Sequence, residues 1–182
     1  MDGKMRAWQV RRLGAPAEVV EPGTLPIPAP RPGELLIEVG AVALNLPDVL
    51  FCRGTYHERA EPPFTPGCEV VGTVVATNGA GPEVGTRVVA MPRLPHGGLA
   101  DYCVAPARDS FPVPATMPDA HAAALSVAYQ TAWLALHRRG RVERGQTVLV
   151  HGAAGGVGSA AIQIARAAAA TVIATARGAA RR

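Results

Sequence analysis

Residues 147–161, TVLVHGAAGGVGSAA, constrain the fold of this chain more than any other stretch. The β-prone residues 147–150 predict a short buried strand, glycines follow at once, and an alanine-rich amphipathic pattern then predicts a helix. Unsatisfied N–H groups in the first helical turn, together with the helix dipole, favour an anion at such a junction. The stretch therefore predicts a strand–turn–helix unit that holds a phosphate group.

The small residues of this turn have the spacing of a dinucleotide-binding fingerprint. They form an alanine-first variant of GxGxxG, in the strand–turn–helix context that the fingerprint requires. Glycines there let the backbone approach an anion and let the helix pack closely on its strand. The alternative is a flexible turn without a ligand, and the context favours binding. We predict that Gly155, Gly156, Val157 and Gly158 hold a cofactor's pyrophosphate, and that Ala153 and Ala154 also belong to the cofactor-binding residues.

The first part of the chain, residues 1–118, has the pattern of a β domain. Short β-prone runs alternate with glycine- and proline-rich turns, and a proline-dense segment at 21–33 excludes a helix there. One short helix is predicted at 46–53, with Asn45 as a cap and Pro47 in its first turn. Regular spacing of short strands predicts a small, barrel-like β domain. The predicted strands are 5–10, 34–42, 69–76, 87–91 and 99–105.

Residues 119–182 change to alternating helix and strand. We predict a helix at 120–138 that ends at Gly140, and then a strand, helix and strand at 147–150, 157–169 and 171–176. This is a βαβ unit with parallel strands and a right-handed crossover. The predicted fold class is α/β plus β: a β-barrel domain, then a partial Rossmann domain with a doubly wound parallel sheet. A Rossmann sheet has six strands, so the chain either is truncated or has its sheet completed by another chain.

Composition excludes several other classes of protein. The net charge is +4, and the basic residues lack the interleaved aromatics that stack bases, which argues against nucleic-acid binding. No apolar run reaches the roughly 18 residues of a membrane span, and the first residues lack a signal-peptide pattern. Three cysteines without CxxC spacing do not predict a disulfide framework. We expect a soluble cytoplasmic protein.

Further motifs carry a family resemblance, and they are spread over the chain. Together with the glycine turn, they resemble the N-terminal part of the medium-chain dehydrogenase/reductase superfamily, in its zinc-independent NADPH:quinone oxidoreductase branch. These motifs are PGE at 32–34, ALNLPD at 43–48, RGTY at 53–56, PGCEVVG at 66–72, GGLADY at 97–102 and QTA at 130–132.

The resemblance implies a GroES-like catalytic domain over residues 1–118 and a Rossmann domain over 119–182 that binds NADPH. It implies hydride transfer to a quinone or an α,β-unsaturated carbonyl, with a homodimer as the family expectation. In complete family members a C-terminal segment returns to finish the catalytic domain, and we expect that return to be absent here. Two alternatives remain: an enoyl-thioester reductase of the same superfamily, and a catalytically silent fragment that acts only in binding or assembly.

The resemblance also predicts that no metal is bound. Ligand positions of zinc-dependent relatives fall on Asn45, on Cys68 and near Val127. A catalytic zinc needs three protein ligands, and these positions offer one thiolate. We therefore expect Cys68 to be a small buried side chain rather than a nucleophile.

Three residues are candidates for a catalytic or cofactor-binding role, and each could instead have a purely structural role. By resemblance Asn45 lines the nicotinamide and acceptor pocket, although it also suits a helix N-cap. Tyr56 resembles a tyrosine that donates to a substrate oxygen, although a half-buried aromatic fits equally well. Thr131 resembles a threonine that faces the nicotinamide, although threonine in helices often bonds back to its own backbone.

The end of the second predicted strand indicates which cofactor is bound. In NAD-specific folds an acidic residue there binds the ribose hydroxyls. Here Ala176 takes that place, with Arg177 and Arg181 close by in sequence. Guanidinium groups pair bidentately with phosphate oxygens, so we predict that NADPH is preferred over NADH.

Overall fold

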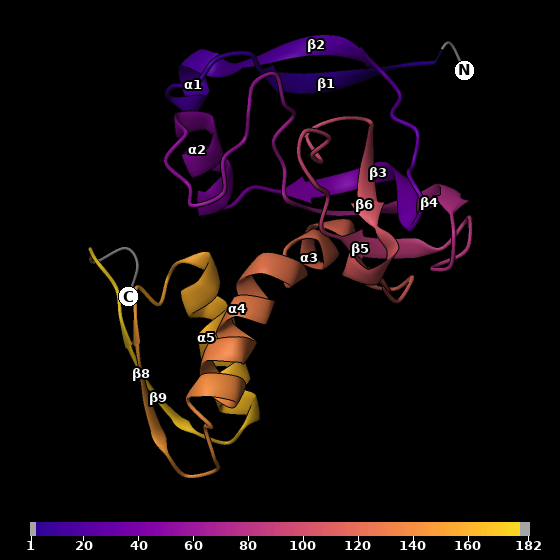
Figure 1. Cartoon of the computed structure of the whole chain (residues 1–182). Coiled ribbons are helices and arrows are strands. Elements are labelled where there is room, and N and C mark those ends of the chain that lie inside the picture. The colour runs from indigo at the N-terminus through magenta and orange to yellow at the C-terminus, as the bar shows by residue number, and fades with distance from the viewer. Residues whose placement is uncertain (1–2, 179–182) are drawn as a thin grey trace. The chain divides into compact units, whose positions relative to one another are not determined.

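The computed structural model of the chain describes residues 3–178, so Arg181 lies outside the described residues. The chain divides into two compact units, Met1–Ala124 and Leu125–Arg182 (Figure 1). Each unit is taken by itself below.

The first unit begins with a two-stranded antiparallel ribbon. Strand β1 (Lys4–Val10) pairs along its whole length with β2 (Val20–Pro26), and β2 from its second residue onward lies in the proline-dense segment predicted to be extended. Side chains of β1 alternate between buried and exposed, as expected of a strand with one covered face. The short helix α1 (Pro16–Val19) connects the two strands and was not predicted.

Five further strands form an antiparallel sheet in the order β6-β3-β4-β5-β7. Their bounds are Tyr102–Pro106, Glu34–Ala43, Glu69–Asn78, Arg87–Ala90 and Ser110–Pro112 in that order, and β7, preceded by a 3₁₀ turn, was not predicted. The sheet buries an aliphatic core in which each of the following side chains is fully covered: Leu35, Ile37, Val70, Val74, Val88 and Cys103. The short helix α3 (Asp119–Ala123) contacts β3 and β4 and ends the unit.

The predicted barrel is not closed in the described part of the chain. β6 and β7 form the two edges of the five-stranded sheet, and the β1–β2 ribbon reaches the rest through isolated bridges, Ala7 with Ala100 and Val10 with Phe64. β3 carries two register irregularities against β4, which bend a strand and increase its twist. The unit is therefore a curved open sheet with an attached ribbon.

Helix α2 (Leu46–Arg53) has the predicted bounds because its sequence supplies both end signals. Asn45 takes the N-cap position with a proline in the first turn, and Gly54 ends the helix in the left-handed conformation, at φ 67°. The helix packs on a second apolar cluster through Cys52, which lies with Phe64 and Val10 of β1. The N-terminus of α2 lies at the end of β3, because the helix begins three residues after Ala43.

The second unit begins with a helical run whose winding differs from the prediction of an α-helix. Leu125–Tyr129 and Leu134–Arg139 are π-helical, and one α-helical turn, α4 (Gln130–Trp133), lies between them. Gly140 does end the run, but with right-handed φ and ψ; Arg141, at φ 47°, is the left-handed residue. The hydrophobic periodicity located the helix without revealing the wider turns.

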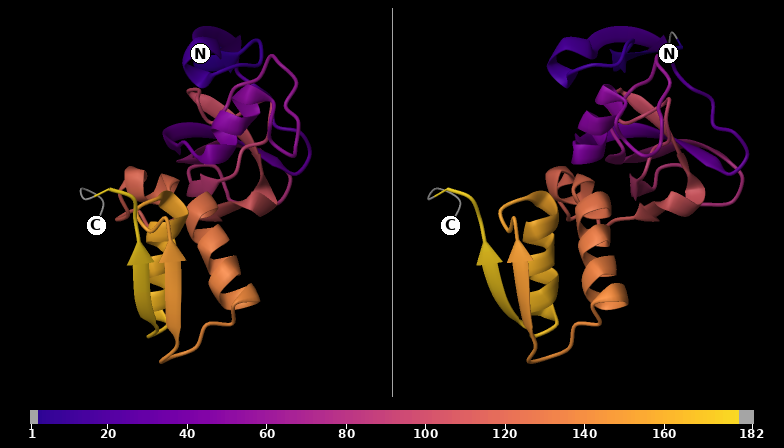
Figure 2. Two further views of the ribbon diagram at one scale, coloured as in Figure 1. Left: turned by 90° about the vertical axis from the view of Figure 1, so that its left-hand side faces the viewer. Right: turned by 60° about the vertical axis from the view of Figure 1, so that its left-hand side comes forward.

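A βαβ unit follows, as predicted. Strands β8 (Thr147–His151) and β9 (Thr171–Thr175) are parallel neighbours, connected by α5 (Gly156–Ala167), and Figure 2 shows both arrows pointing the same way. Val150 is buried, whereas Leu149 and its partner Ile173 are each 53% exposed. The prediction of a wholly buried strand is therefore wrong for the described residues, because side chains alternate and α5 covers one face.

Candidate functional site

The glycine turn after β8 is held in place by β9 and by its own backbone. Gly152 has a positive φ of 64°. The Ala153 N–H donates to the Thr175 carbonyl at 2.9 Å, and the Gly155 N–H donates to the Gly152 carbonyl at 2.9 Å. The turn is thereby fixed at the carboxyl ends of both strands, where ligands bind in open α/β sheets.

Helix α5 presents open donors at its start. Its N-cap is Gly155, no side chain caps it, and its first turn contains no acidic residue. The Ser159 N–H donates to the Gly155 carbonyl at 2.8 Å and so begins the helical hydrogen bonding. The N–H groups of Gly156, Val157 and Gly158 come before that bond and have no i−4 acceptor within the helix, which is the arrangement found at helix N-termini that bind anions.

Two glycines of this turn serve different purposes. A Cβ on Gly158 would overlap the Gly152 carbonyl oxygen and lie 2.8 Å from the Ala153 Cα, so the close packing of helix on turn requires glycine. A Cβ on Gly156 would meet one atom within 4 Å, the Ala128 Cβ at 3.9 Å. The space at Gly156 is therefore open to a bound group.

The carboxyl ends of β8 and β9 bring polar side chains to the same edge as the turn. His151 Nδ1 and Thr175 Oγ1 are 2.9 Å apart. Ala176 follows β9 and Arg177 is exposed, so no carboxylate occupies the position that binds ribose hydroxyls in NAD-specific folds. At this position the described chain has an exposed guanidinium and no acidic side chain.

Thr131 lies in α4, in the same unit as the glycine turn. Its neighbour Ala132 packs with Ala128 and with Ala160 of α5 in an apolar cluster, while Thr131 itself is exposed. Within residues 3–178 its hydroxyl has no hydrogen-bond partner, so the alternative of a bond back to the helix is not observed. The hydroxyl is available to a ligand.

In the first unit, the buried carboxylate of Asp48 organises the start of α2. Its Oδ2 accepts the Asn45 backbone N–H at 2.8 Å, and its Oδ1 accepts the backbone N–H groups of Gly67 at 2.8 Å and Cys68 at 3.2 Å. The Cys68 thiol also donates to Oδ2, at 3.3 Å. Asp48 therefore joins the helix N-terminus to the loop before β4.

Asn45 holds the N-cap position, but its amide is turned toward β4. Its Nδ2 donates to Glu69 Oε1 at 2.8 Å and to the Ala43 carbonyl at 3.4 Å. Because the carboxylate of Glu69 accepts, the amide nitrogen faces it and the amide oxygen faces elsewhere. Buried Glu69 thus orients the Asn45 amide, and a contact across 24 residues leaves no local sequence signal.

Tyr56 is a half-buried aromatic that follows the glycine at the end of α2. Its ring centroid lies 4.6 Å from that of Phe51 and 4.1 Å from that of His57. Among the described residues its hydroxyl has no hydrogen-bond partner. Asn45 and Tyr56 flank opposite ends of α2, whose eight residues span about 12 Å, so the helix separates their backbones.

The three cysteine thiols are held in the protonated form. Burial, followed by the nearby charge of Asp48, raises the pKa of Cys68 to about 12, and burial raises the pKa of Cys103 to about 12. Burial and Asp48 also raise the pKa of Cys52. Thiolates are the reactive species, so none of these groups is poised as a nucleophile.

We expect the folded chain to react slowly with the thiol reagent DTNB at about pH 8. In about 6 M guanidinium the thiols regain their ordinary pKa of about 8.5, and all three should react quickly. Since folding raises these pKa values, the protonated thiols add to the free energy of unfolding. This contribution is complete below the pKa of the unfolded chain and is lost as the pH rises toward the pKa values of the folded chain. Unfolding free energy measured from about pH 8 upward should therefore fall. Fast reaction of one thiol in the folded chain would contradict this account.

Residues 3–178 contain no group of three or more histidine, cysteine, aspartate or glutamate side chains placed to hold a metal ion. The zinc-ligand positions of the resembled family hold Asn45, which donates a hydrogen bond to Glu69, and Cys68, whose thiol donates a hydrogen bond to Asp48.

Over residues 3–178, no helix combines the length and apolar character needed to cross a membrane.

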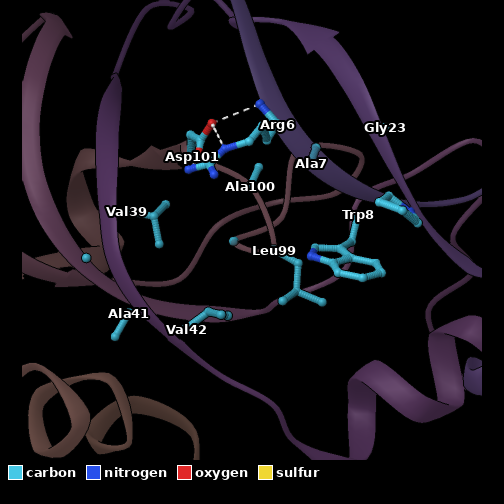
Figure 3. A pocket seen from close by; sticks show the side chains of 13 residues that line it. Arg6, Ala7, Trp8, Gly23, Val39, Ala41, Val42, Leu99, Ala100 and Asp101 are labelled. Carbon is cyan, nitrogen blue, oxygen red and sulfur yellow. Dashed lines mark hydrogen bonds and ion pairs between the residues drawn. The ribbon is translucent and has the colours of Figure 1, made fainter.

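A cavity of about 480 Å³ in the first unit is separate from the predicted site residues (Figure 3). Its walls include Val39 and Val42 of β3 with Leu99 opposite, and Trp8 of β1 lies beside Leu99. The Arg6 guanidinium and Asp101 form an ion pair at 2.9 Å along its rim. No predicted acceptor or cofactor residue lines this cavity.

Comparison with known proteins agrees with this architecture. The alcohol dehydrogenase GroES-like domain family matches residues 31–115. Quinone oxidoreductase from Rattus norvegicus is 36% identical over 175 residues, which is 94% of this chain and 53% of the relative. The Homo sapiens quinone oxidoreductase is 36% identical over 165 residues, which is 90% of this chain and 50% of the relative. The chain thus spans about half the length of the curated relatives it matches.

Solved structures give the same result. Quinone oxidoreductase from Thermus thermophilus, crystallised also as its complex with NADPH, is 40% identical with a TM-score of 0.84, over 97% of this chain and 55% of that one. A probable oxidoreductase from Mycobacterium abscessus is 38% identical with a TM-score of 0.90, over 98% and 57%. The fold thus places the chain with oxidoreductases that carry a GroES-like domain. The chain belongs to the medium-chain dehydrogenase/reductase superfamily and matches the N-terminal portion of its quinone oxidoreductases.

Proposed function

We propose that this chain is part of a zinc-independent oxidoreductase that transfers a hydride from NADPH to a quinone or an α,β-unsaturated carbonyl. NADPH, when bound, supplies the hydride. The chain's own residues then bind the cofactor, position the acceptor and stabilise the charge that forms on its oxygen.

The observation that carries the proposal is the N-terminus of α5. It combines N–H groups without i−4 acceptors, no acidic residue in the first turn, and open space at Gly156. These features fit a pyrophosphate, which would lie against residues 153–158. Arg177 and Arg181 would pair with the 2′-phosphate, and the Thr131 hydroxyl would face the nicotinamide.

In the first unit, the hydrogen bonds of the candidate residues suggest a division of roles. The amide nitrogen of Asn45 already donates to Glu69, so Asn45 would offer its oxygen as an acceptor, for example to a ribose hydroxyl of the cofactor. The phenol of Tyr56 has no partner among the described residues and would donate to the acceptor's oxygen. Tyr56 is therefore our candidate for oxyanion stabilisation.

The proposal is tested by following NADPH oxidation with 9,10-phenanthrenequinone and, separately, with a crotonyl thioester. We expect turnover with the quinone, and Tyr56→Phe should lower kcat about 10- to 100-fold, the loss typical of one hydrogen-bond donor to developing charge. Stability should change little, because the hydroxyl bonds to no described residue.

Phe51→Leu is the matched control, since it alters the packing of the Tyr56 ring and leaves the phenol in place. Turnover with the thioester alone would favour the enoyl reductase. No turnover with either acceptor, together with no rise in melting temperature on adding NADPH, would favour a catalytically silent chain.

A further inference from the structure

A second hollow in the first unit, of about 390 Å³, lies apart from every residue assigned above to cofactor or acceptor. Its volume is within the range of small-molecule pockets. Prolines, whose φ is fixed, form much of the wall, so the hollow is largely preformed. The apolar part of the wall includes Leu25, Pro26, Pro28, Phe64, Leu94 and Val104.

Two buried polar side chains, those of Gln9 and Thr65, line this hollow. Gln9 is 8% exposed and Thr65 is 2% exposed. The Gln9 amide oxygen accepts from Arg11 at 3.3 Å, while the Gln9 amide nitrogen and the Thr65 hydroxyl have no hydrogen-bond partner within residues 3–178. Over the same residues no fully buried side-chain nitrogen or oxygen lacks a partner, so both groups retain access to solvent.

Buried polar groups in proteins are normally hydrogen-bonded, to the protein or to something bound. The Thr65 hydroxyl can donate or accept, and the Gln9 amide nitrogen donates two N–H groups. Because both line the same hollow, they provide donors to a ligand there. These two side chains are the observation that separates this hollow from a surface depression.

The charged side chains around the hollow leave one guanidinium without a partner. Arg93 is paired with Asp109 at 3.6 Å, and the Glu34 carboxylate accepts the Arg31 backbone N–H at 2.8 Å. In the described part of the chain the Arg31 guanidinium makes no ion pair or hydrogen bond. Burial lowers the pKa of His96, and the positive charge of Arg31 lowers it further, while the negative charge of Glu34 raises it. The charge of Arg31 therefore acts on a side chain that lines the hollow.

We propose that this hollow binds a small organic monoanion, with its apolar body against Phe64 and Leu94 and its carboxylate against Arg31 and Thr65. A guanidinium and a hydroxyl together match the acceptor oxygens of a carboxylate. Glu34 disfavours a dianion. The site is independent of the proposed oxidoreductase function.

The test uses the whole chain and benzoate as the probe, with benzyl alcohol and benzylamine as neutral and cationic analogues of similar shape. Binding is measured by saturation-transfer NMR and by the shift in melting temperature. We expect benzoate to bind at least ten-fold more tightly than benzyl alcohol, and benzylamine to bind most weakly. Arg31→Gln should lower the affinity for benzoate about ten-fold and leave the affinity for benzyl alcohol unchanged.

Thr65→Val, which keeps the side-chain shape, should lower the affinity for benzoate about three-fold. The control Arg166→Gln, on α5, should leave that affinity unchanged. Circular dichroism of each variant confirms that it is folded. Equal binding of the three probes, tighter binding of benzylamine, or an Arg31→Gln variant that binds benzoate normally would overturn the proposal. Loss of NADPH binding is a separate readout that bears on the proposed function alone.

Discussion

Gly158→Ala is expected to lower the free energy of unfolding of the second unit by about 3 kcal/mol and to weaken NADPH binding more than ten-fold. The added methyl group would overlap the Gly152 carbonyl oxygen and approach the Ala153 Cα. Both neighbours are backbone atoms, so no side-chain rotation relieves the overlap, and the helix must move away from the turn. The change is measured by urea denaturation, followed by Trp133 fluorescence in a Trp8→Phe background.

Gly156→Ala is the matched control for this substitution. Its methyl group would meet one atom within 4 Å, at ordinary contact distance, and Gly156 is the first residue of α5, without a positive φ that alanine could not adopt. Stability should therefore hold or rise, while NADPH binding falls, because the methyl group occupies the space that we assign to the pyrophosphate. Equal loss of stability in the two variants would contradict the distinct roles of these glycines.

Asp48→Ala is expected to lower the free energy of unfolding of the first unit by about 4 kcal/mol, with Asp48→Asn costing about 2 kcal/mol. The alanine variant leaves the N–H groups of Asn45, Gly67 and Cys68 without their acceptor in a buried place. The asparagine variant keeps one oxygen but turns an amide nitrogen toward a donor. Urea denaturation followed by Trp8 fluorescence, in a Trp133→Phe background, reports this change.

Asp109→Ala serves as the control for charge. Asp109 is partly exposed, and its ion pairs with Arg93 and Arg108 are long, at 3.6 and 3.7 Å. Exposed ion pairs of this kind contribute up to about 1 kcal/mol to the free energy of unfolding. If Asp48→Ala cost no more than Asp109→Ala, the carboxylate would not be what joins α2 to the loop before β4.

Most elements could be predicted because their signals are local. α2 carries its cap, its proline and its terminal glycine within ten residues, and its predicted bounds are confirmed. The pieces that were missed depend on distant partners: β7 exists by pairing with β5, and α1 packs against α2. The π-helical turns were also missed, because the same pattern of apolar residues is compatible with an α-helix and with a π-helix.

The candidate site divides in the same way. The glycine turn is contiguous, so its spacing predicted the strand–turn–helix geometry that the structure contains. The contact of Asn45 with Glu69 depends on the register of β3 against β4, which sets Ala43 opposite Glu69. No local pattern encodes that register, so the orientation of the Asn45 amide could not be predicted. The roles assigned to Asn45, Tyr56, Thr131 and Arg177 remain predictions.

The central claim, that the turn at the start of α5 binds NADPH in preference to NADH, is tested most directly by titrating the chain with each cofactor under identical salt conditions. Isothermal calorimetry gives both affinities. The account predicts at least ten-fold tighter binding of NADPH, and a smaller preference in Arg177→Gln, because a guanidinium is lost from the 2′-phosphate. Equal affinity for the two cofactors in the unmodified chain would contradict it.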